Sequence, residues 1–461
     1  MDKAFPELGS FRDPSGFLFR YQGTLYRQIN QCYQSNYELL LTSGLYDALI
    51  RHGLLVPHQE ISNVHAPERD LVYKIIEPEE VQFVSYPYEW SFVQLRGAAL
   101  TTLRIAKLAL EYGMQLKDAS AYNIQFHKGR WRLIDTLSFE KYQEGQPWIA
   151  YRQFCQHFLA PLALMAYQDR RFYLLSRLFI DGIPLDMASK LLPLRTKLRL
   201  NLLMHIHLHA RSQTRYADQG LKKDLPCRNM NRKAMEGLLD SLRQSVKSLS
   251  MELGGTEWAN YYDSTNYSRE AFEEKKAIVE TFLDLAQPKT VWDLGANTGE
   301  FSRLASKRGI FTVAFDIDPD AVTHNYLQMR KERDTNLLPL MMDLTNPSPS
   351  LGWAHEERNS LISRGPVDCV LALALVHHLA IANNVPLYKL AAFFKEICTY
   401  LIIEFIPKND SQVVRLLNSR EDIFDDYHVE GFERAFATYF EVIKKKPISD
   451  SDRLIYYMKV K

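Results

Sequence analysis

The chain has 461 residues, which at about 150 residues per domain predicts two to four domains. It carries 56 Lys and Arg against 55 Asp and Glu, and this net charge of +1 argues against a protein built mainly to coat nucleic acid or anionic membrane. The five cysteines lie far apart without a CxxC pair, which argues against a zinc ribbon or a disulfide scaffold. With no apolar stretch of about 18 residues and no signal-like start, we expect a cytoplasmic protein without a membrane span.

The first 210 residues mix short strands with helices and predict an α+β domain. From 150 to 210 the chain is mostly helical in pattern. Before that, the expected elements are an irregular lead-in over 1–16, a hairpin over 17–29, a helix over 36–52, strands at 71–76 and 81–86, and a helix over 100–113.

Residues 211–256 are polar, contain one amphipathic helix over roughly 233–253, and are interpreted as a helical connector. From 257 to 461 apolar strands alternate with helices, which predicts βαβ units and a parallel sheet covered on both faces. The expected helices span 268–286, 299–309 and 321–334, and the expected strands span 290–295, 311–318, 338–343, 367–375 and 398–405.

The most specific motif follows the first of these strands. The strand delivers Asp293 to its carboxyl end, and the chain turns through Gly295 and Gly299 into a helix, as a ligand that approaches the backbone closely requires. Asp316 ends the next strand, at the place where an acidic residue accepts hydrogen bonds from ribose hydroxyls in doubly wound folds. Asp343 closes a third apolar run. Together these residues predict a nucleotide-type cofactor site.

This order of motifs resembles that of the class I S-adenosylmethionine-dependent methyltransferases. Asn297 stands where the family has its middle glycine, and Asn enters the left-handed region more readily than most residues. The resemblance implies a doubly wound, mostly parallel sheet of seven strands, whose last strand is inserted antiparallel through a reversed hairpin at 440–460. It also implies S-adenosylmethionine as the cofactor and a set of cofactor-binding positions: Asp293 for the ammonium, Gly295, Asn297 and Gly299 for the methionine part, Asp316 and Ile317 for the ribose, Asp343 and Leu344 for the adenine, and Ala374 at the exit of the fourth strand.

Two other interpretations of the glycine loop remain. An NAD-binding domain requires GxGxxG, whereas this loop reads GANTGEF and has no third glycine. A loop that only turns a strand into a helix does not explain the acidic residues that accompany it.

Candidates for the chemistry stand near the fourth and fifth strands. His377 and His378 follow the fourth strand, and either is a candidate general base or a residue that packs the next helix. Glu404 ends the fifth strand and is a candidate catalytic or substrate-orienting group, or a partner of Arg415 or Lys408. Upstream, a lid is expected at Tyr261, Tyr262 and Tyr267, and Lys275 and Lys276 are interpreted as a solvated helix face rather than as partners of the cofactor carboxylate.

A second pattern lies in the N-terminal half. Asp118 is followed five places later by Asn123, then by a short hairpin and by Asp135 between apolar residues. The pattern resembles the catalytic core of the kinase-like superfamily, in its small-molecule phosphotransferase branch. The resemblance implies that Asp118 orients an acceptor hydroxyl while Asn123 and Asp135 hold magnesium on ATP. Arg27 stands where the phosphate-binding Lys is expected, and no glycine-rich loop precedes the hairpin, so an active kinase, a degenerate binding domain and chance spacing all stay open.

The sequence therefore predicts a methyltransferase that moves a methyl group from S-adenosylmethionine to an O or N nucleophile of a small molecule rather than of a nucleic acid. Its fold class is α/β in the C-terminal domain, with a kinase-like α+β N-terminal domain that binds substrate or nucleotide. The whole chain resembles bacterial nodulation-type methyltransferases, which implies a saccharide or lipo-oligosaccharide acceptor. The alternatives are a bifunctional enzyme with an active ATP-dependent phosphotransferase and a non-catalytic binding protein. His205, His207 and His209 have metal-ligand spacing, but packed or solvated histidines are preferred.

Overall fold

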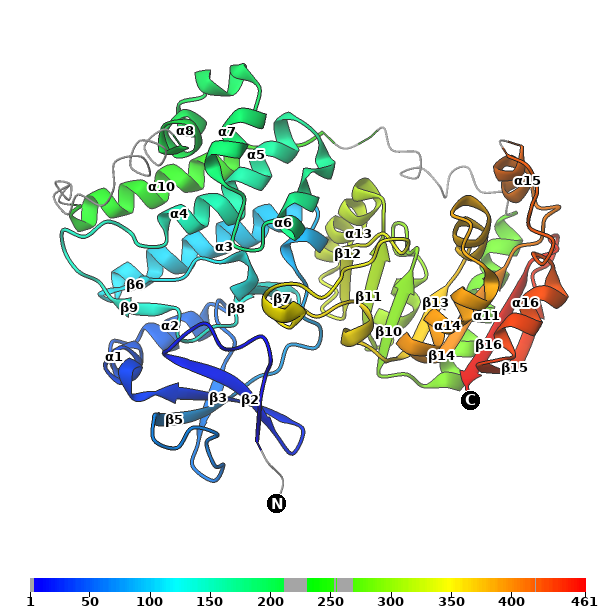
Figure 1. Ribbon diagram of the computed structural model, residues 1–461, viewed down its shortest axis with the longest axis horizontal. Coiled ribbons are helices and arrows are strands. Elements are labelled where there is room, and N and C mark those ends of the chain that lie inside the picture. The colour runs from blue at the N-terminus through cyan, green and yellow to red at the C-terminus, as the bar shows by residue number, and fades with distance from the viewer. Residues whose placement is uncertain (1–3, 211–229, 253, 255–267, 419) are drawn as a thin grey trace. The chain divides into compact units, whose positions relative to one another are not determined.

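The computed structural model describes residues 4–210, 230–252, 254, 268–418 and 420–461 (Figure 1). Two compact units divide the chain. The N-terminal unit comprises Met1–Glu252 together with Leu351–Arg358, and the C-terminal unit comprises Leu253–Ser350 and Asn359–Lys461.

An antiparallel sheet of five strands opens the N-terminal unit, in the order β1-β2-β3-β5-β4. Two helices, α1 and α2, lie in the sequence between β3 and β4. The elements are β1 (Phe5–Pro6), β2 (Gly16–Tyr21), β3 (Thr24–Asn30), α1 (Gln34–Thr42), α2 (Leu45–Arg51), β4 (His58–Ile61) and β5 (Val72–Pro78).

Two sequence expectations in this region are wrong. The helix expected over 36–52 is interrupted after α1, because Gly44 adopts a left-handed φ of 82°. Residues 81–86 form no strand, since the polar groups of Ser85 bond to a side chain and not to a neighbouring strand. The N–H of Ser85 donates to Gln125 Oε1 and its carbonyl accepts from Gln125 Nε2, both at 2.9 Å.

The rest of the N-terminal unit is built around the long helix α3, which begins after the cap residue Ser91, well before the expected start at residue 100. Short hairpins follow it, and then a helical region. The elements are α3 (Phe92–Glu111), β6 (Met114–Leu116), β7 (Ile124–His127), β8 (Arg130–Leu133), β9 (Phe139–Lys141), α4 (Tyr151–Phe154), the π-turn Cys155–Leu159, α5 (Ala160–Tyr167), α6 (Leu175–Leu178), α7 (Leu185–Leu191), the 3-10 turn Leu194–Leu198, α8 (Leu200–Leu202), the π-turn Leu203–Leu208 and α10 (Arg232–Ser248).

Helix α10, which the sequence assigns to the connector, packs on α3. Lys107 Nζ lies 2.9 Å from Asp240 Oδ1 across this contact. The N-terminal unit also includes residues 351–358. Two of the Arg12 guanidinium nitrogens, Nε and Nη2, donate to the Glu357 carboxylate at 2.7 and 2.6 Å, and the Arg358 guanidinium lies 4.1 Å from the centre of the Tyr122 ring. This segment and α10 therefore belong to the N-terminal unit through ion pairs and cation–π packing.

The C-terminal unit is an α/β fold with a mixed sheet of seven strands in the order β12-β11-β10-β13-β14-β16-β15 (Figure 1). The first five strands are parallel, and β16 lies between β14 and β15, antiparallel to both, as the sequence predicts for the final hairpin. The strands are β10 (Thr290–Leu294), β11 (Phe311–Asp316), β12 (Leu337–Met341), β13 (Val367–Ala372), β14 (Cys398–Phe405), β15 (Phe440–Pro447) and β16 (Leu454–Val460).

Helices connect these strands, and apolar side chains from α11, β10, β13, β14 and β16 form one core on the sheet. Within this core the rings of Phe282 and Tyr457 stack at 5.5 Å. The helices are α11 (Arg269–Ala286), α12 (Ser302–Ser306), α13 (Pro319–Glu332), the π-turn His378–Ala382, α14 (Leu387–Ile397), α15 (Ser411–Leu417) and α16 (Val429–Phe436). Among the helices that the structure describes, none has both the length and the apolar character needed to cross a bilayer.

Candidate functional site

A cavity of about 250 Å³ opens beyond the carboxyl ends of β10, β11, β12 and β13. Ligands of open α/β sheets bind at this edge, where the order of strands reverses. The predicted positions that line the cavity are Asp293, Gly295, Asn297, Asp316, Ile317, Asp343, Leu344, Ala374 and His378.

The loop after β10 brings backbone close to the cavity. Gly295 has a φ of 77°, and a Cβ built there lies 3.3 Å from Leu375 Cδ1. Asn297 has a φ of 49°, which confirms that Asn adopts the left-handed conformation in place of the middle glycine. Gly299 has another role, because it does not line the cavity and its Cβ would lie 2.5 Å from the amide atoms of Asn325 on α13.

Asp316 and Asp293 are carboxyls facing this loop. Asp316 Oδ2 accepts the backbone N–H of Asn297 at 2.7 Å, and its Oδ1 accepts the N–H of Asp318 at 2.8 Å. Ser302 Oγ donates to Asp293 Oδ2 at 2.6 Å. Burial raises the pKa of Asp316 to about 6 and that of Asp293 to about 7, and the nearby charge of Asp316 adds to the rise at Asp293. A ligand that carries a positive charge would stabilise the ionised form of these two buried carboxyls.

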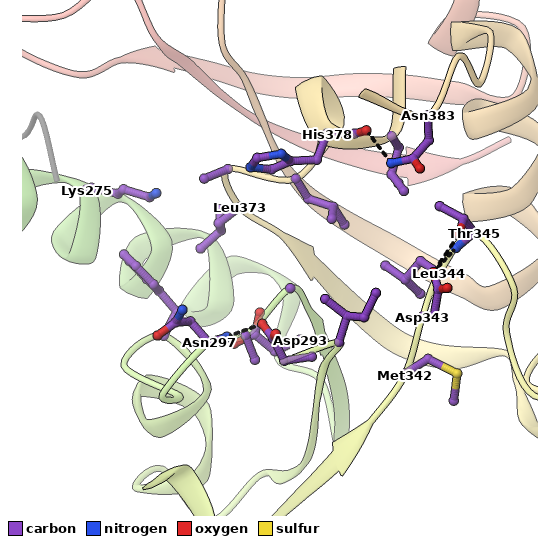
Figure 2. A pocket seen from close by; sticks show the side chains of 18 of the residues that line it. Lys275, Asp293, Asn297, Met342, Asp343, Leu344, Thr345, Leu373, His378 and Asn383 are labelled. Atoms are coloured by element: carbon purple, nitrogen blue, oxygen red, sulfur yellow. Dashed lines mark hydrogen bonds between the residues drawn. The ribbon is translucent and has the colours of Figure 1, made fainter. Parts of the chain in front are cut away.

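Figure 2 shows the residues that follow β12 at the opposite end of the cavity from Lys275 and His378. Asp343 Oδ1 accepts from both the N–H and the hydroxyl of Thr345, at 2.8 and 2.6 Å. Met342 and Leu344 give this end an apolar wall beside a carboxylate, which suits a flat heterocycle with an amino group.

Lys275 lines the cavity, although the sequence analysis prefers a solvated helix face to a role at the cofactor. It is 3% exposed, its Nζ lies 2.7 Å from Glu404 Oε2, and it lines the cavity, so the interpretation as a solvated helix face is wrong. Burial lowers its pKa, and Glu404 opposes that effect. The partners lie 129 residues apart, so no local pattern reveals the pair. Lys276 remains at the surface beside Glu273.

Glu404 does not line the cavity, and its partners differ from those expected. It accepts the N–H of Ala374 at 2.7 Å, holds Lys275 through the same Oε2 oxygen, and lies 3.7 Å from Arg453 through Oε1. Ala374 has a left-handed φ of 50°. Glu404 therefore fixes the chain at the exit of β13 and positions Lys275, whereas Lys408 pairs with Asp422.

The two adjacent histidines have different surroundings. His377 is 1% exposed, does not line the cavity, and burial lowers its pKa well below the ordinary value. His378 lines the cavity, and its carbonyl accepts from Asn383 Nδ2 at 2.8 Å across the π-turn (Figure 2). Of the two, the structure brings only His378 to the cavity wall.

The N-terminal candidates also come together. Arg27 Nη1 lies 2.6 Å from Asp135 Oδ1, and the same carboxylate accepts from the N–H of Leu137 at 3.1 Å and from the hydroxyl of Ser138. Burial raises the pKa of Asp118, which the hydrogen bond from Asn123 opposes and the charge of Asp135 reinforces.

Tyr261, Tyr262 and Tyr267 lie outside the described residues. His205 bonds to Tyr151 Oη at 2.8 Å and to Ser241 Oγ at 2.9 Å, and His209 stacks on the Tyr151 ring. The histidines of this segment are packed, as the sequence analysis prefers.

The chain is similar over nearly its whole length to a known nodulation protein. It is 36% identical over 454 residues to the nodulation protein NoeA of Rhizobium meliloti (strain 1021), a match that covers 97% of this chain and 94% of NoeA. The chain belongs to the NoeA family of nodulation proteins. This match confirms the resemblance to nodulation-type proteins. No family model matches the chain.

Solved structures similar to the NoeA-family chain include methyltransferases. ChlM, the magnesium protoporphyrin IX methyltransferase of Synechocystis PCC 6803, is 17% identical and covers 44% of this chain and 93% of its own, with a TM-score of 0.32. The N-methyltransferase NodS of Bradyrhizobium japonicum WM9 is 9% identical and covers 42% of this chain and 98% of its own, with a TM-score of 0.30. The bifunctional kinase-methyltransferase WbdD is 17% identical and covers 44% of this chain and 42% of its own, with a TM-score of 0.30.

Proposed function

We propose that the C-terminal unit binds S-adenosylmethionine and transfers its methyl group to an O or N nucleophile of a small-molecule acceptor. One observation carries this proposal: Asp293, the left-handed Asn297 and Asp316 meet at one cavity beyond the strand ends. Membership of the NoeA family supports a saccharide or lipo-oligosaccharide as the acceptor, in keeping with a nodulation protein.

The residues present fit this cofactor. Asp293 and Asp316 are buried carboxyls with raised pKa, suited to an ammonium group and to ribose hydroxyls respectively. The close backbone at Gly295 leaves space for the methionine part, and Met342, Asp343 and Leu344 suit the adenine. When bound, the cofactor supplies an electrophilic methyl group on a sulfonium. The wall of the cavity aligns the acceptor with it and excludes water.

His378 is the residue that we assign to hold or remove the proton of the acceptor. It lines the cavity and lies on the π-turn that follows β13, whereas His377 and Glu404 do not line the cavity. Lys275 is held by Glu404 at the same end, where its positive charge suits the carboxylate of the cofactor.

The test uses S-adenosylmethionine labelled in its methyl group and a series of saccharide acceptors, with release of S-adenosylhomocysteine as the readout. Acceptor-dependent release that falls at least tenfold in His378→Ala, with cofactor affinity unchanged in calorimetry, supports the proposal. Release that does not change in His378→Ala contradicts the role of this residue, and failure of the wild type to bind S-adenosylmethionine contradicts the function.

A second candidate function is an ATP-dependent phosphotransferase in the N-terminal unit. Its support is the sheet order β1-β2-β3-β5-β4 with a helix before β4, together with the meeting of Asp118, Asn123 and Asp135. A magnesium ion at Asp135 would compete with Arg27, whose guanidinium already holds one oxygen of the carboxylate. Calorimetry with ATP and magnesium on the wild type and Asp135→Ala separates the cases. A loss of affinity in the variant supports a kinase-like nucleotide site, and equal affinity contradicts it.

A further inference from the structure

One short segment of the N-terminal unit carries three strongly exposed leucines. Leu194, Leu198 and Leu200 are 76%, 88% and 67% exposed, and Leu198 is the most exposed large apolar side chain among the described residues. They stand on the 3-10 turn Leu194–Leu198 and at the start of α8, labelled in Figure 1. Met204 and Leu208 follow Leu200 at steps of four and extend the exposed apolar surface. We call residues 194–200 the docking segment.

A network of hydrogen bonds fixes this segment in place. Thr196 is fully buried, and its hydroxyl donates to the carbonyl of Pro193 at 2.7 Å. Because the hydroxyl proton of Thr196 is donated to Pro193, Thr196 Oγ1 must accept the N–H of His207 Nε2, at 2.9 Å. A neutral His207 then has no proton on Nδ1, so Nδ1 accepts the hydroxyl of Ser189 at 2.8 Å. His207 thus joins α7, the docking segment and the π-turn after α8. These hydrogen bonds hold the backbone that carries the exposed leucines in place.

Cations alternate with these leucines. Arg195, Lys197 and Arg199 occupy the intervening positions, and no acidic residue occurs from 187 to 210. Arg195 and Arg199 are exposed. In a chain whose net charge is only +1, this is a local excess of positive charge on the same surface as the exposed leucines. A fitting partner must accept apolar side chains and carry negative charge.

We propose that the docking segment binds the surface of an anionic phospholipid bilayer. Its leucines enter the boundary between headgroups and acyl chains, and its arginines and lysine meet the lipid phosphates. The protein lies on the membrane in this state and does not span it.

The charge pattern argues against a second copy of the chain as the occupant. A two-fold interface brings the same patch of both copies together, so the cations of one docking segment face those of the other. Such like-charge contacts oppose association, whereas an anionic lipid surface neutralises them.

The test is sedimentation of the full chain with two kinds of vesicle, one of pure phosphatidylcholine and one of phosphatidylcholine and phosphatidylglycerol in equal parts. We expect binding to the anionic vesicles and little to the neutral ones. Arg195→Glu, Lys197→Glu and Arg199→Glu combined should weaken binding by about a hundredfold, because each cation near an anionic surface contributes about fivefold. Leu194→Ser, Leu198→Ser and Leu200→Ser combined should weaken it at least tenfold.

The matched control reverses Lys444 and Lys446 on β15 and Lys389 on α14, three exposed lysines, which changes the net charge by the same amount elsewhere and leaves the ion pair of Lys445 with Glu433 intact. It should bind as the wild type does. Thr196 and His207 stay intact in all variants, and unchanged circular dichroism and melting temperature show that the fold is retained. Absent binding of the wild type to anionic vesicles, full binding by the leucine variant, or equal loss in the control overturns the proposal. So does a dimer in light scattering that the leucine changes dissociate while vesicle binding is unaffected.

Discussion

Asp293→Asn is expected to stabilise the ligand-free protein, by an amount that grows as the pH rises. The carboxyl is buried and accepts from Ser302, and an Asn oxygen at the same place can accept that bond too. The change therefore removes a charge from the cavity with little change in shape. The folded-state pKa of Asp293 is about 7, whereas an unfolded Asp titrates near 3.9.

The magnitude follows from these two values. About three pH units separate them, and each is worth about 1.4 kcal/mol, so ionising Asp293 costs the folded state about 4 kcal/mol as an upper estimate. Because the folded pKa is raised, the stabilising effect of the protonated form is complete below the unfolded pKa. It is lost as the pH rises through about 7.

The assay compares urea unfolding of the wild type and Asp293→Asn at about pH 5 and about pH 8, followed by circular dichroism. The variant should be more stable by about 1.5 kcal/mol near pH 5 and by up to about 4 kcal/mol near pH 8, because the loss in the wild type begins at the unfolded pKa and is complete above about pH 7. Bound cofactor should offset this destabilisation of the wild type, because its ammonium favours the charged carboxylate of Asp293. The affinity of the wild type for the cofactor should therefore rise with pH up to about 7. A difference in stability that does not depend on pH refutes the reasoning.

Two further substitutions test the packing around the cavity. Lys275→Met should cost about 3–5 kcal/mol of unfolding free energy, because it leaves the buried Glu404 carboxylate without its main cation, and adding Glu404→Gln should recover most of the loss. A double variant no more stable than the single one argues against this account. Gly299→Ala should destabilise by at least about 1 kcal/mol, given its φ of 83° and the 2.5 Å approach to Asn325, whereas Gly237→Ala on α10, where nothing lies within 4 Å, should stabilise slightly. Equal effects in the two glycine variants count against the role of Gly299. Chemical denaturation measures all four proteins.

The sheet of the C-terminal unit could be predicted because its signals are local. Apolar strands end at polar residues that face the cavity, such as Asp293 and Asp316. Parallel strands bring their carboxyl ends to one edge of the sheet. The spacing along the chain therefore places these side chains in one cavity. Asn297 was predictable for the same reason, since the left-handed φ depends on a single residue.

The ion pair of Lys275 and Glu404 could not be predicted in this way. Both residues are charged, and composition favours an exposed position for each. Only the packing of α11 against β14 buries them together. The false strand at 81–86 has a similar origin, because the side chain of Gln125, from a later hairpin, takes the hydrogen bonds that a neighbouring strand would otherwise make.

The short motif in the N-terminal half predicts only some of the contacts that its residues make. The spacing of Asp118, Asn123 and Asp135 predicts that they meet, but it does not predict that Arg27 holds the Asp135 carboxylate. That contact depends on the register of β3 in the five-stranded sheet, which is set by its hairpin with β2 and by its pairing with the more distant strand β5.

Titration calorimetry with S-adenosylmethionine, on the wild type and on Asp316→Ala, tests the central claim most directly. The account predicts one binding site in the wild type and at least a tenfold loss of affinity in the variant, since Asp316 is the carboxyl that we assign to the ribose hydroxyls. A wild type that does not bind S-adenosylmethionine, or a variant that binds it equally well, would contradict the account.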